Sequence, residues 1–272
     1  MDDMNRGKGP VIIAVCGKGG VGKTSVSAML ARCLAADANK QILAIDADPA
    51  VGLATALGIS VRQTVDDVRN RIIQDLKSGQ GKNKAELMAR IDYQMLDTLA
   101  EHGNTAFLAI GRPEDEGCYC RLNSFLRAMI AKLAHSFDYV VIDAEAGIEQ
   151  INRRVMEMVT HLILVSDGSL KSHNVAGMIA DVAKRCAAFR EIGLLVNRCR
   201  PGDEKNRLPS LADIPILGSI PEDDTIRDFD AAGKPFFSLP PCDALHVVES
   251  VAAAITGGTH AAAARGPGRR PG

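Results

Sequence analysis

Short apolar runs alternate with longer amphipathic segments along most of this chain. The apolar runs lie at 11–16, 42–46, 105–111, 139–143, 161–166, 192–197 and 215–220. Segments with helical periodicity lie between or after them, at 23–36, 121–135, 149–158, 171–187 and 244–255. Strands that are apolar throughout are typical of parallel sheets covered by helices on both faces. The pattern therefore predicts an α/β fold with a mostly parallel central sheet.

Two segments depart from this alternation. Residues 60–104 are charged and favour helices, with no clear strand, which predicts helices inserted beside the sheet. Residues 259–272 are rich in glycine, proline and arginine without apolar periodicity, which is typical of a disordered tail. We therefore expect one domain at 10–258, between a flexible N-terminus at 1–9 and that tail.

Composition and charge narrow the class of protein. The chain has 46% hydrophobic and 24% charged residues and a formal net charge of -1. This balance is that of a soluble globular protein, and it gives no electrostatic case for nucleic-acid binding. The first residues lack the apolar core of a signal peptide, and no apolar stretch reaches the roughly 18 residues of a membrane span. We expect a cytoplasmic protein with no nucleic-acid or membrane partner.

A phosphate-binding loop follows the first apolar run. The sequence GKGGVGKT at 17–24 fits the pattern G-x-x-x-x-G-K-[ST], between a predicted strand and a predicted helix. Glycines let the backbone N–H groups face phosphate oxygens. Lys23 should reach the β- and γ-phosphates, and the Thr24 hydroxyl should bind Mg²⁺. The expected nucleotide contacts are Gly17, Gly19, Gly20, Val21, Gly22, Lys23, Thr24 and Ser25.

Two more predicted strands end in carboxylates. AIDADPA at 44–50 carries Asp46 and Asp48, and YVVIDAEAG at 139–147 carries Asp143 at the end of its apolar run. An aspartate in the latter position holds Mg²⁺ directly or through water, and Asp46 could support the same ion. A carboxylate at a strand end is often only a helix cap. Together with the phosphate loop, the three predict one magnesium–nucleotide site, with Gly147 as the hinge of a γ-phosphate switch.

Lys18 is one lysine more than a phosphate loop requires. The stretch KGGVGKT at 18–24 resembles the deviant Walker A motif of the MinD, ParA and nitrogenase-iron-protein class of ATPases. The resemblance implies that Lys18 crosses a nucleotide-sandwich homodimer to the phosphates of the other subunit. It also implies that Asp48 orients or activates the attacking water. A positive charge supplied only on dimerisation would stabilise the transferring phosphoryl group as an arginine finger does.

The identity of the base follows from a missing motif and from the same resemblance. No N-K-x-D or T-K-x-D sequence, which would read guanine, occurs in the chain, so ATP is favoured over GTP. Asn197 stands where relatives contact the adenine amino group. Pro221 and Glu222 would flank the purine.

Cys118 and Cys120 differ from the other five cysteines, whose neighbours are typical of core or capping positions. They flank Tyr119 in a glycine-bearing loop before a predicted helix, so both thiols could point the same way. One pair supplies two ligands, whereas a closed tetrahedral zinc site needs four, and a twofold dimer would provide the other pair. Thiolates accept Zn²⁺ and Ni²⁺ alike. The alternative is a pair of reduced thiols with no metal.

Several segments point to a narrower family. GRPEDEGCYC at 111–120 with the following RLNSFLR, DAEAGIEQINR at 143–153 and VSDGSLKS at 165–172 resemble the carbon monoxide dehydrogenase accessory ATPases, the CooC family, and their relatives in acetyl-CoA synthase maturation. The resemblance implies a homodimeric, Mg²⁺-dependent ATPase that assists nickel insertion and binds zinc or nickel through Cys118 and Cys120 of each subunit. Ala144, Gln150 and SDGS at 166–169 depart from the commonest versions, which puts details of the second switch in question.

Three other functions fit the sequence less well. A nitrogenase-like electron donor needs a cysteine after the second switch, and 144–185 contain none. An iron–sulfur carrier ATPase of the Mrp type typically has a C-x-x-C pair near its C-terminus, where Cys242 stands alone. A MinD- or ParA-type positioning ATPase needs an amphipathic C-terminal helix or a basic DNA-binding face, and the terminal RGPGRRPG has no apolar stripe. The sequence therefore favours a metallochaperone ATPase.

Overall fold

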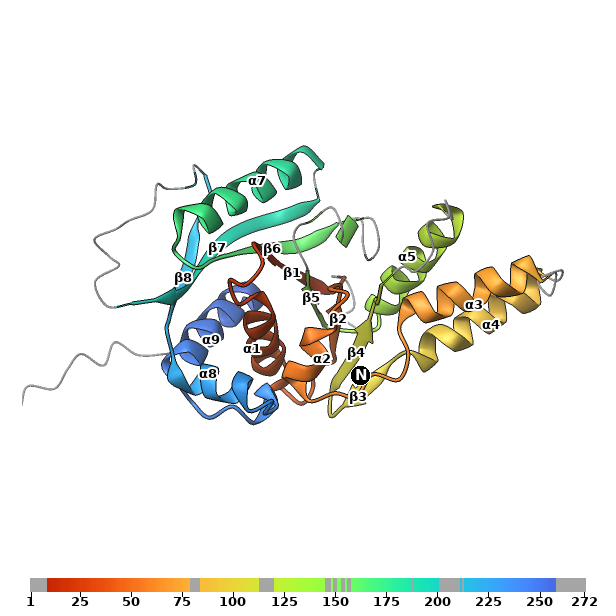
Figure 1. Cartoon of the computed structure of the whole chain (residues 1–272), viewed down its shortest axis with the longest axis horizontal. Coiled ribbons are helices and arrows are strands. Elements are labelled where there is room, and N and C mark those ends of the chain that lie inside the picture. The colour runs from red at the N-terminus through yellow and green to blue at the C-terminus, as the bar shows by residue number, and fades with distance from the viewer. Residues whose placement is uncertain are drawn as a thin grey trace, which may run out of the picture.

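The computed structural model forms one α/β domain around a central sheet (Figure 1). It describes residues 9–78, 84–112, 120–144, 158–186, 188–200 and 213–257, and the single positions 148, 151, 152, 155 and 211. At 84–89, 120 and 121 only the backbone is described. Within these residues, no helix is long and apolar enough to cross a membrane.

Eight strands make up the described sheet, in the order β3-β4-β2-β5-β1-β6-β7-β8. They are β1 (Val11–Gly17), β2 (Ile42–Asp46), β3 (Ala100–His102), β4 (Thr105–Ala109), β5 (Tyr139–Asp143), β6 (Val159–Ser166), β7 (Phe189–Cys199) and β8 (Ile216–Pro221). All neighbouring pairs are parallel except β3 with β4, which is antiparallel. The predicted fold class is confirmed.

Helices cover both faces of this sheet. They are α1 (Lys23–Ala35), α2 (Gly52–Leu57), α3 (Val65–Lys77), α4 (Lys84–Asp97), α5 (Cys120–Ala134), α7 (Leu170–Cys186), α8 (Asp224–Ala231) and α9 (Asp243–Thr256), with a short 3₁₀ turn, η2 (Phe236–Ser238). Side chains of β1 alternate between the two layers: Ile13 and Val15 pack with α1, α2 and α9, while Ala14 and Cys16 pack with α3, α5 and α7. Burial on both faces explains why the strands are apolar throughout.

The segment 60–104 contains the expected helices and also a strand that was not expected. A capping box, in which Thr64 and Asp67 exchange side-chain-to-backbone hydrogen bonds, starts α3. Figure 1 shows α3 and α4 projecting from the sheet with α5 beside them. The expectation of no strand here is wrong at the end of the segment, because Ala100–His102 pairs with β4 as an edge strand. Two of its three residues are exposed, so the strand has no apolar periodicity that the sequence could reveal.

Two short helices, α2 and α8, were not predicted either. They span six and eight residues, too few for a helical period to stand out from its surroundings. The helix predicted at 149–158 falls mostly outside the described residues, as do the N-terminal segment 1–8 and the tail 259–272. Those expectations remain predictions.

Candidate functional site

The carboxyl ends of the parallel strands meet at one edge of the sheet, where α/β proteins bind their ligands. β1 ends at Gly17, between β5 and β6, and the chain then turns through the phosphate loop into α1. β2 and β5 lie side by side with Asp46 opposite Asp143. The topology therefore brings together three segments that the sequence assigned to one nucleotide site.

The phosphate loop uses its glycines to turn tightly. Gly20 and Gly22 have φ values of 83° and 92°, a region that favours glycine because it has no Cβ. Gly22 is the N-cap of α1, so no side chain covers the first N–H groups of the helix. Lys23 is 8% exposed, and its Nζ donates to the Lys18 carbonyl at 3.3 Å. The loop thus presents helix N–H groups and a lysine to an anion.

Gly22 also lies against the side chain of Asn197, which leaves no room for a Cβ. A Cβ built on Gly22 would lie 2.3 Å from Asn197 Nδ2, whereas a Cβ on Gly19 would meet nothing within 4 Å. Gly22→Ala is therefore expected to lower the free energy of unfolding by about 2 kcal/mol or more, because it adds a clash to backbone strain. Gly19→Ala is the matched control and should stay within about 0.5 kcal/mol. Urea unfolding of both variants checks this, and equal losses would contradict it.

Hydroxyl groups from α1 hold the carboxylate of Asp143. Thr24 Oγ1 donates to Asp143 Oδ2 at 2.7 Å, and Ser27 Oγ donates to Asp143 Oδ1 at 3.1 Å. Ser27 was not predicted as a site residue. Its position three residues after Thr24, on the same face of the helix, is the sequence signal that could have found it. The cluster joins the end of β5 to the start of α1, directly under the phosphate loop.

Asp46 lies opposite Asp143 and is completely buried. Its carboxylate accepts hydrogen bonds from the N–H of Asp48 at 3.0 Å and of Leu53 at 2.8 Å. Burial raises the pKa of Asp46 to about 7, and the neighbouring Asp143 adds to that rise. Burial likewise raises the pKa of Asp143 to about 6, against the lowering effect of the hydrogen bonds from Thr24 and Ser27. The pair therefore favours an added positive charge.

The oxygen donors of this cluster fit a magnesium ion. Mg²⁺ prefers a few carboxylate and hydroxyl oxygens and completes its shell with water and phosphate. Thr24 supplies a hydroxyl, and Asp143 and Asp46 supply two carboxylates whose pKa is raised mainly by burial. The residues present therefore match the donor set expected of a magnesium–nucleotide site.

Asp48 lies in the turn between β2 and α2. It is half-buried, and its Oδ1 accepts a hydrogen bond from the N–H of Ala50 at 2.8 Å. Its charge also contributes, after the larger effect of burial, to the raised pKa of Asp143. The structure thus places Asp48 at the rim of the cluster, with its carboxylate held by the turn.

Lys18 is half-buried, and its Nζ donates to the Gly19 carbonyl of its own loop at 3.4 Å. The end of β6 runs beside this loop, because Gly17 pairs with Val165. Burial would raise the pKa of Asp167, but hydrogen bonds from Ser172 and Ser169, with the charge of Lys18 nearby, lower it to about 2. Asp167 belongs to the SDGS stretch, noted in the sequence only as a departure from the family, and proves to be an anion beside Lys18.

The ends of β7 and β8 bring the expected adenine contacts to the same edge. Asn197 is buried, and its Nδ2 donates to the Val21 carbonyl at 2.8 Å. Pro221 pairs with Cys199 across the two strands, and the N–H of Glu222 donates to the Cys199 carbonyl at 3.0 Å. Glu222 is exposed, and its Oε2 accepts from Arg200 Nε at 2.7 Å. Asn197 therefore contacts the phosphate loop directly, and Pro221 and Glu222 lie beside Cys199, two residues further along β7.

The proposed transition-metal ligands are not placed by the structure. Cys118 and Gly147 lie outside the described residues, and Cys120 is described only as the first backbone position of α5. In the described part of the chain, no group of three or more His, Cys, Asp or Glu side chains is arranged to hold a metal. Burial raises the pKa of the Cys16 and Cys33 thiols to about 12. Cys186, by contrast, is exposed as the last residue of α7, so of the two expected positions, core or capping, the core is wrong for it.

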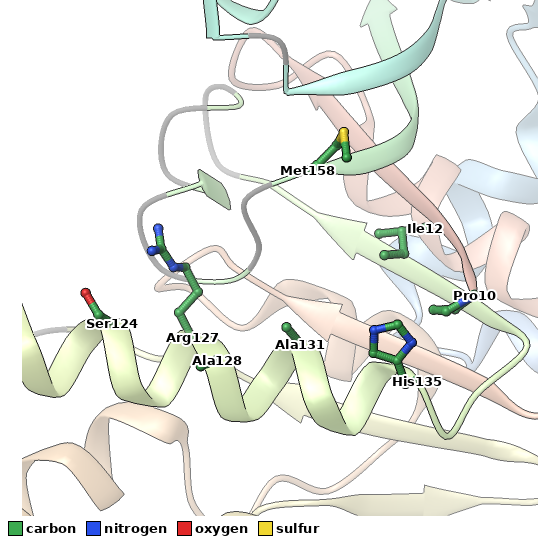
Figure 2. Close-up of a pocket in the computed structure, with 8 residues that line it drawn as sticks. All are labelled: Pro10, Ile12, Ser124, Arg127, Ala128, Ala131, His135 and Met158. Carbon is green, nitrogen blue, oxygen red and sulfur yellow. The ribbon is translucent and has the colours of Figure 1, made fainter. Parts of the chain in front are cut away.

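A cavity of about 430 Å³ lies elsewhere, between α5 and the start of β1 (Figure 2). Figure 2 shows Arg127 and His135 of α5 on one side and Ile12 and Met158 on the other. Pro10 and Ile12 are at the opposite end of β1 from the phosphate loop, so this cavity is not part of the nucleotide site.

Known proteins resemble the chain over nearly its full length. The CbiA family, described as the CobQ/CobB/MinD/ParA nucleotide binding domain, matches residues 12–236. An uncharacterized ATP-binding protein of Methanocaldococcus jannaschii is 35% identical over 85% of this chain and 92% of its own. The carbon monoxide dehydrogenase accessory protein CooC of Rhodospirillum rubrum is 31% identical over 84% and 90%.

Solved structures share the fold. The septum site-determining protein MinD of Pyrococcus horikoshii, complexed with Mg-ADP, superposes with a TM-score of 0.63 at 22% identity, covering 90% of this chain and 96% of that one. The match to the family description covers the phosphate loop, both carboxylate-bearing strands and Asn197. The chain therefore belongs to the CobQ/CobB/MinD/ParA family of nucleotide-binding P-loop proteins.

Proposed function

We propose that this protein is an ATP-hydrolysing maturation factor that assists nickel insertion into carbon monoxide dehydrogenase or acetyl-CoA synthase. The observation that carries the proposal is the 31% identity to CooC over most of both chains, in a sequence that has the pair Cys118 and Cys120 before α5. The magnesium-binding donor set beside the phosphate loop supports the hydrolytic part. The protein works as a homodimer linked by nucleotide and by metal.

Hydrolysis is assigned to residues of the strand-end cluster. Thr24, Asp46 and Asp143 hold Mg²⁺, which neutralises charge on the phosphates when it is bound. Lys23 binds the β- and γ-phosphates of its own subunit. Asp48 orients water for attack on the γ-phosphorus, so that water adds as the bond to the ADP oxygen breaks and phosphate leaves. Lys18 of the other subunit stabilises the charge that develops.

Base recognition is assigned to the ends of β7 and β8. Asn197 keeps one lone pair of Oδ1 free of the hydrogen bond it accepts from Arg198, so it accepts from the adenine amino group. Pro221 and Glu222 flank the purine. The contact of Asn197 with the phosphate loop, and the pairing of Pro221 with Cys199 two residues further along β7, support this assignment.

The cargo metal is assigned to the cysteine pairs of two subunits. Four thiolates, Cys118 and Cys120 from each, bind Zn²⁺ or Ni²⁺ between the subunits. ATP brings the subunits together and so assembles the metal site, and hydrolysis loosens it. Because binding linkage is reciprocal, metal tightens ATP-driven dimerisation to the same extent that ATP tightens metal binding.

The cysteine role is tested by removing both thiols. A variant carrying Cys118→Ser and Cys120→Ser is expected to lose at least about tenfold in affinity for Zn²⁺ and Ni²⁺, because all four thiolates of the dimer are lost. Titration calorimetry and the molar mass with and without metal measure the effect. Cys186→Ser, which removes an exposed thiol on α7, is the matched control. Metal-linked dimerisation that persists in the double variant would refute the cysteine site.

The client is tested separately. The protein is co-produced with a nickel-dependent carbon monoxide dehydrogenase, and enzyme activity is measured as nickel in the medium is varied. We expect the wild type to lower the nickel concentration needed for half-maximal activation, and the double cysteine variant not to do so. Equal curves for cells with and without the protein would reject this client while leaving the ATPase assignment standing.

A further inference from the structure

The carbonyl groups of the phosphate loop are held by residues from a distant strand. Arg198 Nη1 donates to the Gly20 carbonyl at 3.0 Å, and Asn197 Nδ2 donates to the Val21 carbonyl at 2.8 Å. Both donors lie at the end of β7, about 180 residues further along the chain. Two successive peptide units of the loop are therefore fixed from outside.

Fixing a carbonyl also fixes the N–H on the other side of its peptide bond. The peptide unit is planar, and in a trans unit the C=O and the N–H point in opposite directions. The described residues contain no cis peptide bond. The hydrogen bond from Arg198 to Gly20 thus turns the Val21 N–H away from β7, and that from Asn197 to Val21 does the same for the Gly22 N–H. In the described structure neither N–H donates to a protein acceptor.

The backbone at Arg198 is strained in a way that serves this contact. Arg198 has a φ of 58°, and Val51 and Asp213 are the other described non-glycine residues with positive φ. This left-handed conformation is unfavourable for a residue with a Cβ and persists only where the surroundings hold it. Here the Asn197 side chain holds it, because its Oδ1 accepts from the Arg198 N–H at 3.0 Å. The register of β7 with β8 also shifts between Val196 and Cys199.

We propose that Arg198, together with Asn197, is a positioning residue that preorganises the N–H groups of Val21 and Gly22 for phosphate. Arg198 acts through the loop backbone. It therefore determines affinity for the polyphosphate part of any ligand, and the base plays no part in its effect. The proposal rests on phosphate binding by the loop and is independent of the nickel client and the cysteine site.

Two probes distinguish binding of the polyphosphate from binding of the base. Binding of a fluorescent ADP with Mg²⁺ is measured directly, and inorganic tripolyphosphate, which has no base, is measured by competition. Arg198→Ala is expected to weaken both by the same factor, about tenfold, because a misdirected N–H lowers phosphate affinity. Arg198→Lys should restore part of the loss, since an ammonium group also donates to a carbonyl. Unchanged binding, or a loss confined to the fluorescent ADP, would overturn the proposal.

Two further variants distinguish positioning from a purely structural role. Arg198→Gly removes the same guanidinium and also relieves the positive φ, so we expect it to melt at a higher temperature than Arg198→Ala while losing the same phosphate affinity. Arg190→Ala, at the exposed start of β7, is the control and should change neither property. If Arg198→Gly bound phosphate as well as the wild type, the loss in Arg198→Ala would come from backbone strain alone. The guanidinium would then have no positioning role.

A measurement on the ligand-free protein tests the positioning role of Arg198 separately from nucleotide binding. In the ligand-free protein, the ¹⁵N–¹H amide resonance of Val21 is expected to shift in Arg198→Ala and to stay in place in Arg190→Ala, since only the former frees the Gly20 peptide unit. A stationary Val21 resonance would refute the positioning role. Failure of the wild type to bind either probe would instead refute nucleotide binding, whatever the amide resonance shows.

Discussion

Asp143→Asn is expected to abolish magnesium-dependent ATP hydrolysis and, at the same time, to stabilise the nucleotide-free protein at pH 8. The first effect follows from the proposed magnesium site, because the neutral amide is a poor ligand for Mg²⁺. We expect hydrolysis to fall by at least about 100-fold. The second effect follows from burial, because Asp143 is 1% exposed and lies opposite a second buried carboxylate, Asp46. Burial disfavours the charged carboxylate more than the hydrogen bonds and the charge of Lys23 favour it, so removing this charge favours the folded state.

The sign of the pH dependence can be worked out from the raised pKa. The folded, metal-free chain holds a proton on Asp143 up to about pH 6, whereas a carboxyl with the ordinary value of 3.8 releases it earlier. Between these values the folded state binds more protons, so its stability falls as pH rises. The stability that the proton on Asp143 gives the folded state is fully present below about pH 4 and is lost above about pH 6. At pH 8 the asparagine variant should be more stable by about 2 kcal/mol, and near pH 4 the difference should vanish.

The substitution is suited to the site because both neighbours are hydroxyls. Thr24 and Ser27 each donate to Asp143 now, and a hydroxyl can also accept from the new amide. Urea unfolding at pH 4 and pH 8, without nucleotide or metal, measures the stability, and phosphate release measures hydrolysis. Asp181→Asn, on the exposed face of α7, is the control for removing a negative charge. Wild-type hydrolysis in Asp143→Asn would remove this carboxylate from the site.

Lys18→Ala is expected to lower ATP hydrolysis by about a thousandfold while leaving ADP binding within a factor of about three. The reason is that the Lys18 ammonium donates to the Gly19 carbonyl of its own loop and is proposed to act on the nucleotide of the other subunit. Lys23 is the lysine proposed to bind the phosphates of its own subunit, so Lys23→Ala should lose binding as well. Lys184→Ala, an exposed lysine on α7, controls for loss of charge. Phosphate release and equilibrium binding of a fluorescent ADP give the two measurements.

Mixing two inactive variants tests action between subunits directly. In Asp48→Asn the new side chain can still accept from the Ala50 N–H, so the turn after β2 is kept while the proposed water-orienting carboxylate is lost. A heterodimer of this variant with Lys18→Ala contains one complete site: the Lys18→Ala subunit keeps its own Asp48 and receives Lys18 from its partner. We expect hydrolysis to reappear on mixing. Complete absence of recovery would contradict a Lys18 that acts on the other subunit.

Much of the fold was readable because its signals are local. Each buried strand is an apolar run, and Gly22, Lys23 and Thr24 stand at a fixed offset from the end of the first one. β3, α2 and α8 escaped prediction because each is short. Pairing with β4 and packing against the core, rather than a residue pattern, decide that β3 is a strand and not part of the preceding helix.

Most residues of the site could be predicted from the sequence, but their arrangement in space could not. The position of Asp46 and Asp143 at the ends of predicted strands correctly grouped them with the phosphate loop, since the carboxyl ends of parallel strands share one edge of the sheet. The sequence could not show that the two aspartates lie directly opposite each other, or that Asp143 adds to the raised pKa of Asp46, because that depends on strand order and register. Ser27 was accessible from helical spacing and was overlooked. Asp167 was visible in the sequence, but its position beside Lys18 was not.

The sequence by itself determined that this chain carries a phosphate loop with an additional lysine, on a parallel sheet, because glycine spacing and apolar runs act over a few residues. The tertiary structure alone decided what holds that loop in shape. Asn197 lies 176 residues from Val21, and Arg198 lies 178 residues from Gly20. Their hydrogen bonds exist only because β7 ends beside the loop and Arg198 turns into a left-handed conformation. Hydrogen bonds depend on direction as well as proximity, and direction is fixed only once the strands are assembled.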